Sequence, residues 1–406
     1  MELDILIKNA SELLTCKADS PKVREKLRDP GIIENGILGI KNDKIVFVGK
    51  TEGVNFSADK VIDATNKVVM PGFIDCHTHS VFAGSREKEF VKKLRGVPYL
   101  EILKQGGGIL DTVEKTRKAT KEELLEELLK RLDRMISLGT TTIEIKSGYG
   151  LNLETEKKIL EVADLADKKH PISIVKTYLG AHTLPKRETK EDYVEEVISS
   201  LDKIKPYAEF CDIFCEKEPN FSIEETRKIL TAAKDIGYKL KMHSEQLSQL
   251  RSAELAAELK AISADHLEYI SDTGIHEMAK AGVIGVVLPG VTFHLMTKRY
   301  APAREMINNG LALALATDYN PGTCPSENMQ LMISIACREM KMLPAEAINC
   351  STINAAYAIS REKEIGSLEV GKKADILILN AKNHDYIPYH FGINHVEKVI
   401  KNGKII

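Results

Sequence analysis

The sequence predicts a protein of the α/β class, with a (β/α)8 TIM-like barrel and a small β-sandwich built from both ends of the chain. Between about residues 72 and 360, short apolar strands alternate with amphipathic helices. This alternation supplies eight strands over roughly 250 residues, the usual size of such a barrel. Residues 1–70 and 362–406 instead show short strands and turns without a long helix.

The two ends of the chain are predicted to pair in one β-sandwich. Asn42-Asp43 and Asn402-Gly403 each separate two apolar runs, as the turn of a β-hairpin does. Residues 17–31 are charged and contain prolines, which indicates an exposed loop. The expected domains are a composite β-sandwich of residues 1–70 and 362–406, and a barrel of residues 71–361.

The barrel strands are separated by helices with recognisable ends. Thr120 and Glu123 form a capping box before an apolar helix face, and Gly139 ends that helix. Ser222 and Glu225 repeat the capping pattern before another helix. The predicted strands are 73–76, 141–146, 173–179, 210–215, 239–243, 261–265, 283–288 and 311–317.

Composition narrows the function classes. The chain has 406 residues, 43% hydrophobic and 29% charged, with a net charge of -2. Such a balance does not favour binding to nucleic acid or to an anionic membrane. We find neither a signal peptide nor an apolar run of the ~20 residues that a membrane span needs. Seven scattered cysteines without a Cys-x-x-Cys motif fit a reducing cytoplasm.

Histidines and one aspartate lie at the carboxyl ends of predicted strands, where such barrels have their active sites. His77 and His79 follow the first strand, His243 ends the fifth and Asp318 ends the eighth. In an extended chain, His77 and His79 point to the same side. A lone His-x-His is weak evidence for a metal site. Together, however, three histidines and an aspartate are a fitting set for a metal ion that activates water.

Further polar residues follow the same strand ends. His266 follows the sixth strand and could hold or protonate the attacked group. Lys146 could be a carbamylated lysine between two metal ions, but it comes from the second strand and the fourth offers no lysine, which favours one metal ion. Glu216 could be another ligand, although a solvated or salt-bridged rim residue is the favoured alternative.

The remaining histidines are assigned to other roles. His170 and His276 are expected at the surface, and His294 could reach the site from its loop, although a structural role is favoured. The Gly106–Gly108 run could approach a ligand, hinge a lid within residues 80–115, or be a plain flexible loop. Structural roles are expected for the C-terminal histidines His384, His390 and His395.

Several motifs resemble the amidohydrolase superfamily over essentially the whole chain. These are Pro71–His79, the strand-end histidines, Thr317-Asp318 and the late segment 366–375. Finer details resemble the imidazolonepropionases of histidine degradation. They lie in the segments 81–90, 106–117, 146–151 and 316–323.

The resemblance implies a metal-dependent hydrolase that opens the cyclic amide C–N bond of 4-imidazolone-5-propanoate to give N-formimidoyl-L-glutamate. The planar Arg86 guanidinium suits the propionate of this substrate. A homodimer is common among similar enzymes. The resemblance implies zinc or iron held by His77, His79, His243 and Asp318, substrate contacts by Arg86, Tyr149, His182, Gln246 and Thr323, and product contacts by Asn320 and Gly322.

One residue departs from the pattern of related enzymes. Many amidohydrolases that act on cyclic amidines carry a proton-shuttling glutamate three residues after the fifth-strand histidine, where this chain has Gln246. An amide cannot titrate, and Glu245 should point elsewhere if the strand persists. We therefore expect Asp318 to take the proton of the attacking water, while His266 stabilises the developing oxyanion or protonates the departing ring nitrogen.

Two alternatives compete with this interpretation. The first is a deaminase of a cyclic amidine or purine, which Gln246 disfavours because such deaminases need the glutamate. The second is a scaffold without activity, which the complete set of metal-binding side chains disfavours. Assays with the two substrate classes and analysis of the metal content discriminate among the three.

Overall fold

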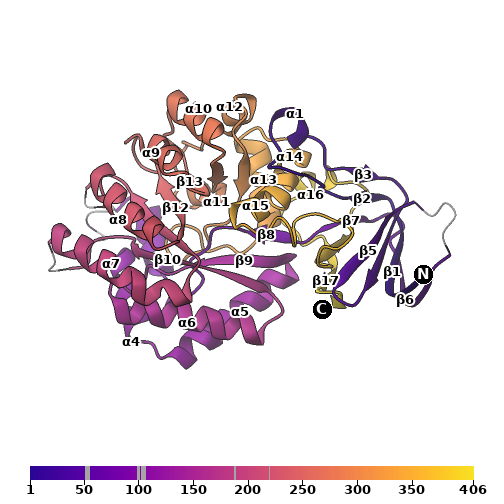
Figure 1. The fold of residues 1–406 in the computed structure, drawn as a ribbon, viewed down its shortest axis with the longest axis horizontal. Coiled ribbons are helices and arrows are strands. Elements are labelled where there is room, and N and C mark those ends of the chain that lie inside the picture. The colour runs from indigo at the N-terminus through magenta and orange to yellow at the C-terminus, as the bar shows by residue number, and fades with distance from the viewer. Residues whose placement is uncertain (51–54, 98–100, 102–106, 187–188, 219) are drawn as a thin grey trace.

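Eight parallel strands form the centre of the molecule. The computed structural model describes residues 1–50, 55–97, 101, 107–186, 189–218 and 220–406. The strands β8 to β15 lie in one sheet in sequence order, with the helices around it (Figure 1). Their bounds are β8 Phe73–Asp75, β9 Thr140–Lys146, β10 Ser173–Ala181, β11 Phe210–Cys215, β12 Lys239–Ser244, β13 Ser263–His266, β14 Ile284–Val287 and β15 Leu313–Leu315.

The first and last strands of this sheet meet just beyond their carboxyl ends. The backbone N–H of Asp318 donates to the carbonyl of His77 (3.0 Å), and that of His79 donates to the carbonyl of Tyr319 (2.9 Å). Thr78 and Tyr319 also form a parallel bridge. These contacts bring β8 and β15 together around the sheet, so the predicted (β/α)8 barrel is confirmed.

The strand ends differ from the prediction by small amounts. β11 matches the predicted range, and β9 begins one residue earlier. β13 begins two residues later than expected, and β15 is shorter at both ends. Pairing with neighbouring strands decides where each strand begins and ends. The sequence of a single strand does not predict that pairing.

Amphipathic helices cover the barrel. The capping boxes predicted at Thr120 and Ser222 are both present, at the starts of α5 and α8. Within the described residues, the helices of the barrel region are α2 Glu87–Leu94, α4 Ile109–Lys118, α5 Lys121–Ser137, α6 Leu153–Lys169, α7 Lys190–Ile204, the 3-10 helix Lys205–Tyr207, α8 Ile223–Asp235, α9 Ser252–Leu259, α10 Asp272–Ala281, α11 Pro289–His294, α12 Ala303–Asn308, α13 Met329–Glu339, α14 Pro344–Cys350 and α15 Ile353–Ala358.

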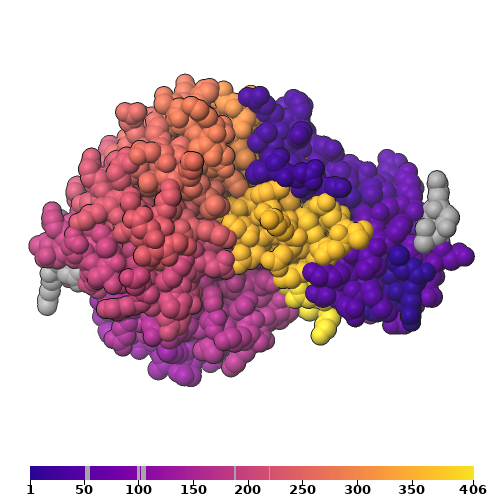
Figure 2. Space-filling view, in the orientation of Figure 1, coloured from indigo at the N-terminus to yellow at the C-terminus, as the bar shows by residue number. Residues whose placement is uncertain are grey.

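The two ends of the chain form two further sheets. In Figure 2 the N-terminal part (indigo) and the C-terminal part (yellow) lie against each other. The four-stranded sheet has the order β5-β4-β1-β6, and the six-stranded sheet has the order β18-β17-β16-β7-β2-β3. Both predicted hairpins are present. The strands are β1 Glu2–Ala10, β2 Glu12–Leu14, β3 Ile32–Ile33, β4 Gly36–Lys41, β5 Lys44–Gly49, β6 Ser57–Asp63, β7 Val68–Pro71, β16 Ile376–Leu379, β17 Val396–Lys401 and β18 Lys404–Ile405, with the short helix α16 Tyr386–Tyr389 between β16 and β17.

The six-stranded sheet has an apolar core on each face. In β7, Val69 packs in the core between the two terminal sheets, whereas Val68 and Met70 pack in the barrel core. In β16, Ile376 and Leu377 divide in the same way, as the alternation of side chains along a strand requires. On this basis we propose the domain division expected above, a β-sandwich of residues 1–70 and 362–406 and a barrel of residues 71–361.

The segment 17–31 is largely an exposed loop, as expected, but part of it is helical and buried. It contains the one-turn helix α1 (Arg24–Leu27), and both Lys22 and Leu27 are buried. The backbone N–H of Lys22 donates to Asn354 Oδ1 at 2.8 Å. Packing against the helices near residue 350 therefore orders a stretch whose composition is typical of loops. Within the described ranges, no helix is long and apolar enough to cross a membrane.

Candidate active site

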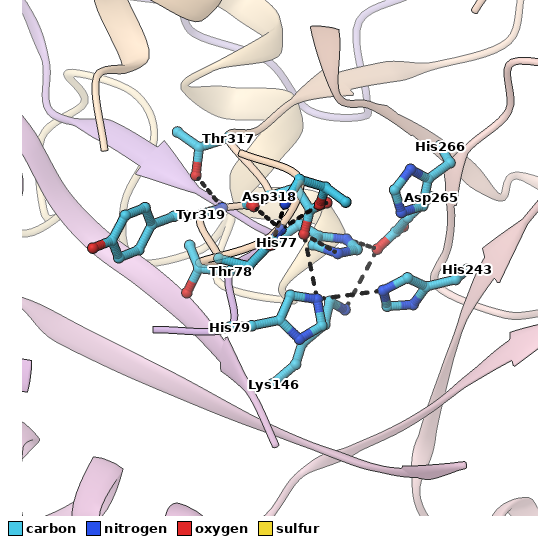
Figure 3. A network of polar contacts seen from close by, with 12 residues as sticks. His77, Thr78, His79, Lys146, His243, Asp265, His266, Thr317, Asp318 and Tyr319 are labelled. Atoms are coloured by element: carbon cyan, nitrogen blue, oxygen red, sulfur yellow. Dashed lines mark hydrogen bonds and ion pairs between the residues drawn. The ribbon is translucent and has the colours of Figure 1, made fainter. Parts of the chain in front are cut away.

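Four side chains from three separate strand ends meet at one point (Figure 3). Asp318 Oδ1 lies 3.4 Å from His77 Nε2 and 3.3 Å from His79 Nε2. His243 Nε2 lies 3.4 Å from His79 Nε2. All four side chains are at least 95% buried. The residues expected to follow the first, fifth and eighth strands are therefore brought together.

The separations of these atoms fit a metal ion. Four donors in a tetrahedron at about 2.0–2.1 Å from a zinc-like ion lie about 3.3–3.4 Å from one another. Among the residues that the structure describes, neither His77 Nε2 nor Asp318 Oδ1 has a hydrogen-bond partner, although both are buried. Buried polar atoms without a partner are costly, and a cation would satisfy both. Three of the separations between these donors thus match those around a metal ion.

Two aspartates lie next to the Nδ1 atoms of two of these imidazoles. Asp265 Oδ2 lies 2.6 Å from His77 Nδ1, and Asp212 Oδ2 lies 3.1 Å from His243 Nδ1. The hydrogen bond between His77 Nδ1 and Asp265 favours the His77 tautomer with the proton on Nδ1, which leaves Nε2 free to bind a metal. Asp212 lies at ion-pair distance from His243 Nδ1 without forming a hydrogen bond to it. Neither aspartate was singled out in the sequence analysis.

The surroundings shift the pKa values of these four groups in different directions. Burial lowers the pKa of His79, and it lowers the pKa of His243 to about 3. Burial and Lys146 also act against the charged form of His77, but Asp265 and Asp318 outweigh them and raise its pKa to about 9. Burial disfavours the Asp318 carboxylate, yet His77 and His79 hold its pKa well below the usual value. Asp318 is therefore an anion that can bind a cation.

A cavity of about 1070 Å³ opens beside these groups. Its lining includes His79, His243 and Asp318, whereas His77 lies behind them and does not line it. Gly322 does not line it either. The other expected site residues that line the cavity are Arg86, Tyr149, His182, Gln246, His266, Asn320 and Thr323.

Arg86 lies in the cavity wall with its guanidinium fixed by a neighbour. Its Nε and Nη2 donate to the two carboxylate oxygens of Glu89 at 2.9 and 2.7 Å. Glu89 also pairs with Lys93, which lines the cavity (3.0 Å). Although burial disfavours the Glu89 carboxylate, Arg86 and the other donors lower its pKa to about 2. Among these three described side chains, one carboxylate thus faces two cations.

Residue 322 is a glycine because Arg86 passes close to its backbone. A Cβ atom at residue 322 would overlap the guanidinium of Arg86. Glycine at this position therefore allows the arginine to pass beside the loop that follows Asp318.

Of the Gly106–Gly108 run, Gly106 lies outside the described residues, and Gly108 donates its N–H to Glu89 (2.9 Å).

A buried glutamate shapes the loop that carries Tyr149. Glu156 accepts the backbone N–H groups of Gly148, Gly150 and Leu151 at 2.7–2.8 Å. Burial raises the pKa of Tyr149, so its hydroxyl remains a donor at neutral pH. The Glu156 contacts therefore fix the position of this donor in the cavity wall.

His182 is a neutral imidazole in the same wall. Its Nδ1 lies 3.0 Å from the carbonyl of Gly148, which assigns the ring proton to Nδ1. Burial lowers the pKa of His182 well below its usual value. The ring stacks on that of His79, with centroids 5.0 Å apart. Nε2 of His182 is therefore an acceptor.

Asn320 organises the loop after Asp318. Its Oδ1 accepts the backbone N–H groups of Gly322 and Thr323, both at 2.8 Å, and its Nδ2 donates to the Asp318 carbonyl at 2.6 Å. Thr323 Oγ1 in turn lies 3.4 Å from Asp318 Oδ2. The Asn320 amide thus holds Thr323 next to the carboxylate.

The residues after β12 divide as expected. Gln246 lines the cavity, whereas Glu245 is fully buried and does not line it. Burial raises the pKa of Glu245 to about 7.

Glu216 is not a solvated or salt-bridged rim residue, and this expectation was wrong. It is 2% exposed and accepts hydrogen bonds from the hydroxyl and backbone N–H of Ser248 and from the N–H of Leu247.

His266 lies beside the four converging groups. Its ring centroid is 5.2 Å from that of His243 and 5.5 Å from that of His77. It is 1% exposed and lines the cavity. His266, His77 and Asp318 offer ligand atoms within 4.8 Å of one another, so these three residues could also hold a metal ion.

Other histidines lie away from the cavity lining. His294 stacks on Phe90, as a structural residue would, and His276 is exposed. The expectation for His170 was wrong, because its side chain is only 7% exposed beside Asp133. His384 contacts Glu12, and the His395 ring lies 2.7 Å from the His390 carbonyl.

Lys146 is surrounded by carboxylates, which favours an ammonium group over an anionic carbamate. Its ammonium lies 2.7 Å from Asp212, 3.1 Å from Glu144 and 3.4 Å from Asp265. Burial acts against this charge, but the three carboxylates outweigh burial and raise the pKa of Lys146. Charged residues within otherwise apolar predicted strands could have indicated this buried cluster from the sequence.

Comparisons with known proteins agree with the geometry. The model of the amidohydrolase family matches residues 68–406. The chain belongs to the amidohydrolase family. Within it, the chain is 52% identical to an imidazolonepropionase of Alkaliphilus oremlandii, with 100% of this chain and 98% of the relative covered. It is 49% identical to an imidazolonepropionase of Fusobacterium nucleatum, with 100% and 99% covered.

Solved amidohydrolase-like structures share the fold at low sequence identity. A 5-methylcytosine deaminase from Klebsiella pneumoniae has a TM-score of 0.76 at 16% identity, with 99% of this chain and 97% of that one covered. An adenosine deaminase from Xanthomonas campestris, solved with bound zinc, has a TM-score of 0.73 at 18% identity, with 100% and 93% covered. At this identity the likeness shows the fold of this amidohydrolase, not its substrate.

Proposed function

We propose that this chain is an imidazolonepropionase, a metal-dependent hydrolase that opens 4-imidazolone-5-propanoate to N-formimidoyl-L-glutamate in histidine degradation. One observation carries the proposal: two buried groups that could hold a metal ion, His77-His79-His243 and His77-His266-Asp318, lie at the cavity that Arg86 also lines. A metal-activated water and a carboxylate-bearing substrate need a metal site and a cationic side chain together. Relatives named imidazolonepropionase match the chain over its full length.

We assign the metal site to His77, His79, His243 and Asp318. A metal ion bound there would lower the pKa of a water molecule and polarise the ring carbonyl of the substrate. Asp318 takes the proton of the attacking water, because its carboxylate lies at the centre of the site. His266 stabilises the oxyanion or gives a proton to the ring nitrogen as the C–N bond breaks. Gln246 hydrogen-bonds the ring but carries no proton between groups.

The cavity wall orients the substrate. Arg86 pairs with the propionate through its planar guanidinium, which Glu89 holds in place. Tyr149 donates from its hydroxyl, and His182 accepts at Nε2. Gln246 and Thr323 complete the substrate contacts, and Asn320 contacts the product. Gly322, which does not line the cavity, leaves room for the Arg86 guanidinium.

The metal, the compartment and the assembly form a further part of the proposal. We propose zinc or iron as the metal ion, since imidazole and carboxylate ligands suit both. The seven cysteines are all free, and six of them are buried, which fits a reducing cytoplasm. We propose a cytoplasmic homodimer.

The direct test is to add 4-imidazolone-5-propanoate to the purified, metal-loaded protein and follow the loss of its ultraviolet absorbance. We expect the absorbance to fall and N-formimidoyl-L-glutamate to accumulate. Adenosine and cytosine, offered in parallel, should release no ammonia, because Gln246 cannot act as the proton-shuttling glutamate. Deamination without loss of the imidazolone would overturn the assignment.

Replacing Arg86 should mainly weaken substrate binding. We expect Arg86→Met to lower kcat/KM by about 100-fold, through KM, because hydrogen bonds to charged groups contribute roughly 1.5–3 kcal/mol each. Steady-state kinetics would measure this. Arg95→Met is the matched control, since Arg95 is exposed just after the same helix. An unchanged KM in Arg86→Met would remove Arg86 from the substrate site.

A further inference from the structure

Five charged side chains lie buried inside the barrel, below the cavity. Each is at most 1% exposed, and none lines the cavity. Burying a charged side chain is costly unless it is paired with an opposite charge. The burial of five charged side chains together therefore needs a physical reason. They are Glu144, Lys146, Asp212, Lys241 and Asp265.

Lys146 links the two aspartates that face the ligand histidines. Figure 3 shows it with one of them, Asp265. Its Nζ lies 2.7 Å from Asp212 Oδ2 and 3.4 Å from Asp265 Oδ2. The same two oxygens face His243 Nδ1 at 3.1 Å and His77 Nδ1 at 2.6 Å. One ammonium therefore joins, through two carboxylate oxygens, two imidazoles that come from strands far apart in the sequence.

Lys241 makes different contacts. Its Nζ lies 2.7 Å from Glu144 Oε2 and donates to the Cys76 carbonyl at 3.1 Å. Glu144 also lies 3.1 Å from Lys146. Glu144 thus joins the two lysines, while the direct contacts to both aspartates come from Lys146.

The charges of this cluster match one divalent ion. Together with Asp318, the cluster has four carboxylates and two ammonium groups. With the imidazoles neutral, as metal binding requires, two negative charges remain, and a single divalent cation at the neighbouring site would neutralise them. Loss of either lysine would leave an uncompensated negative charge.

We propose that Lys146 is a positioning residue for the metal site, holding Asp212 and Asp265 so that His243 and His77 present Nε2 atoms at metal-binding separation. The inference rests on the metal site proposed above. Side chains behind metal-binding histidines typically change metal affinity by about 10–100-fold when replaced. Lys146 acts one contact further from the metal, through both aspartates at once.

The test compares metal binding in full-length variants. We expect Lys146→Met to bind Zn2+ about 10-fold or more weakly in competition with a chromophoric chelator. The absorption spectrum of bound Co2+ should also change, because the geometry of its imidazole ligands relaxes. Lys401→Met is the control, since Lys401 is equally buried and paired with Asp375 (2.6 Å) but lies in β17 of the terminal sheets. It should bind both ions as the wild type does.

A second variant covers the case in which Lys146→Met does not fold. Lys146→Met combined with Glu144→Gln removes one charge of each sign, so the cluster keeps its balance but loses the link between the aspartates. We expect the same weak Zn2+ binding and altered Co2+ spectrum. Wild-type affinity and spectrum in a folded Lys146 variant would overturn the inference while leaving the metal site intact. A wild-type protein that binds neither ion would instead overturn the metal site itself.

Discussion

Asp318→Asn should abolish turnover of 4-imidazolone-5-propanoate, with kcat reduced by about 1000-fold or more. Proton transfer by a positioned side chain typically contributes about 100- to 10,000-fold, and an amide cannot accept the proton of the attacking water. Asp318 Oδ1 is also one of the four converging atoms, 3.3–3.4 Å from the Nε2 atoms of His77 and His79. The absorbance assay measures the rate.

Two measurements separate proton transfer from simple loss of metal. Metal content is determined on the same Asp318→Asn sample, and the rate is expressed per bound ion. Asp272→Asn serves as the control, because Asp272 lies on the exposed first turn of α10. A near-normal rate per bound metal ion in Asp318→Asn would exclude Asp318 as the proton acceptor.

Removal of the metal ion should eliminate activity and lower thermal stability. Prolonged dialysis against a chelator should leave an inactive protein, and adding back zinc or iron should restore the rate. A ligand that binds only the folded state stabilises it, by about 4 kcal/mol at 1000 times its Kd, so we expect Tm to fall on chelation. Calorimetry and metal analysis measure these effects.

The control for this experiment is a chelator saturated with zinc before use, which should change neither rate nor Tm. His243→Ala should lose activity that added zinc does not restore at concentrations sufficient for the wild type. Full activity in a sample that holds far less than one ion per chain would contradict a metal-dependent mechanism.

The sequence by itself determined much of the fold, because the signals involved are local. The alternation of strands and helices, the capping boxes at Thr120 and Ser222 and the two hairpin turns depend on residues close together in the chain. Strand order in such a barrel follows chain order, so the residues after strands could be placed at one end. That rule predicted the convergence of His77, His79, His243 and Asp318.

Burial of polar residues was harder to predict. Glu216 was expected at a solvated rim, but Ser248 and the backbone of Leu247 enclose it. Residues 17–31 have the composition of a loop, but Lys22 and Leu27 are buried against distant helices. Whether a polar side chain reaches water depends on what packs over it, and that covering comes from elsewhere in the chain.

Only the tertiary structure decided which charges support the site. Lys146, Asp212 and Asp265 come from three different strands, and nothing in any one strand says which ammonium faces which carboxylate. Closure of the barrel sets those distances, because its interior is narrow enough for these side chains to meet across it. The sequence thus determined the barrel and the metal-binding residues at its carboxyl end, while the packing of the barrel interior determined the charged network that holds them.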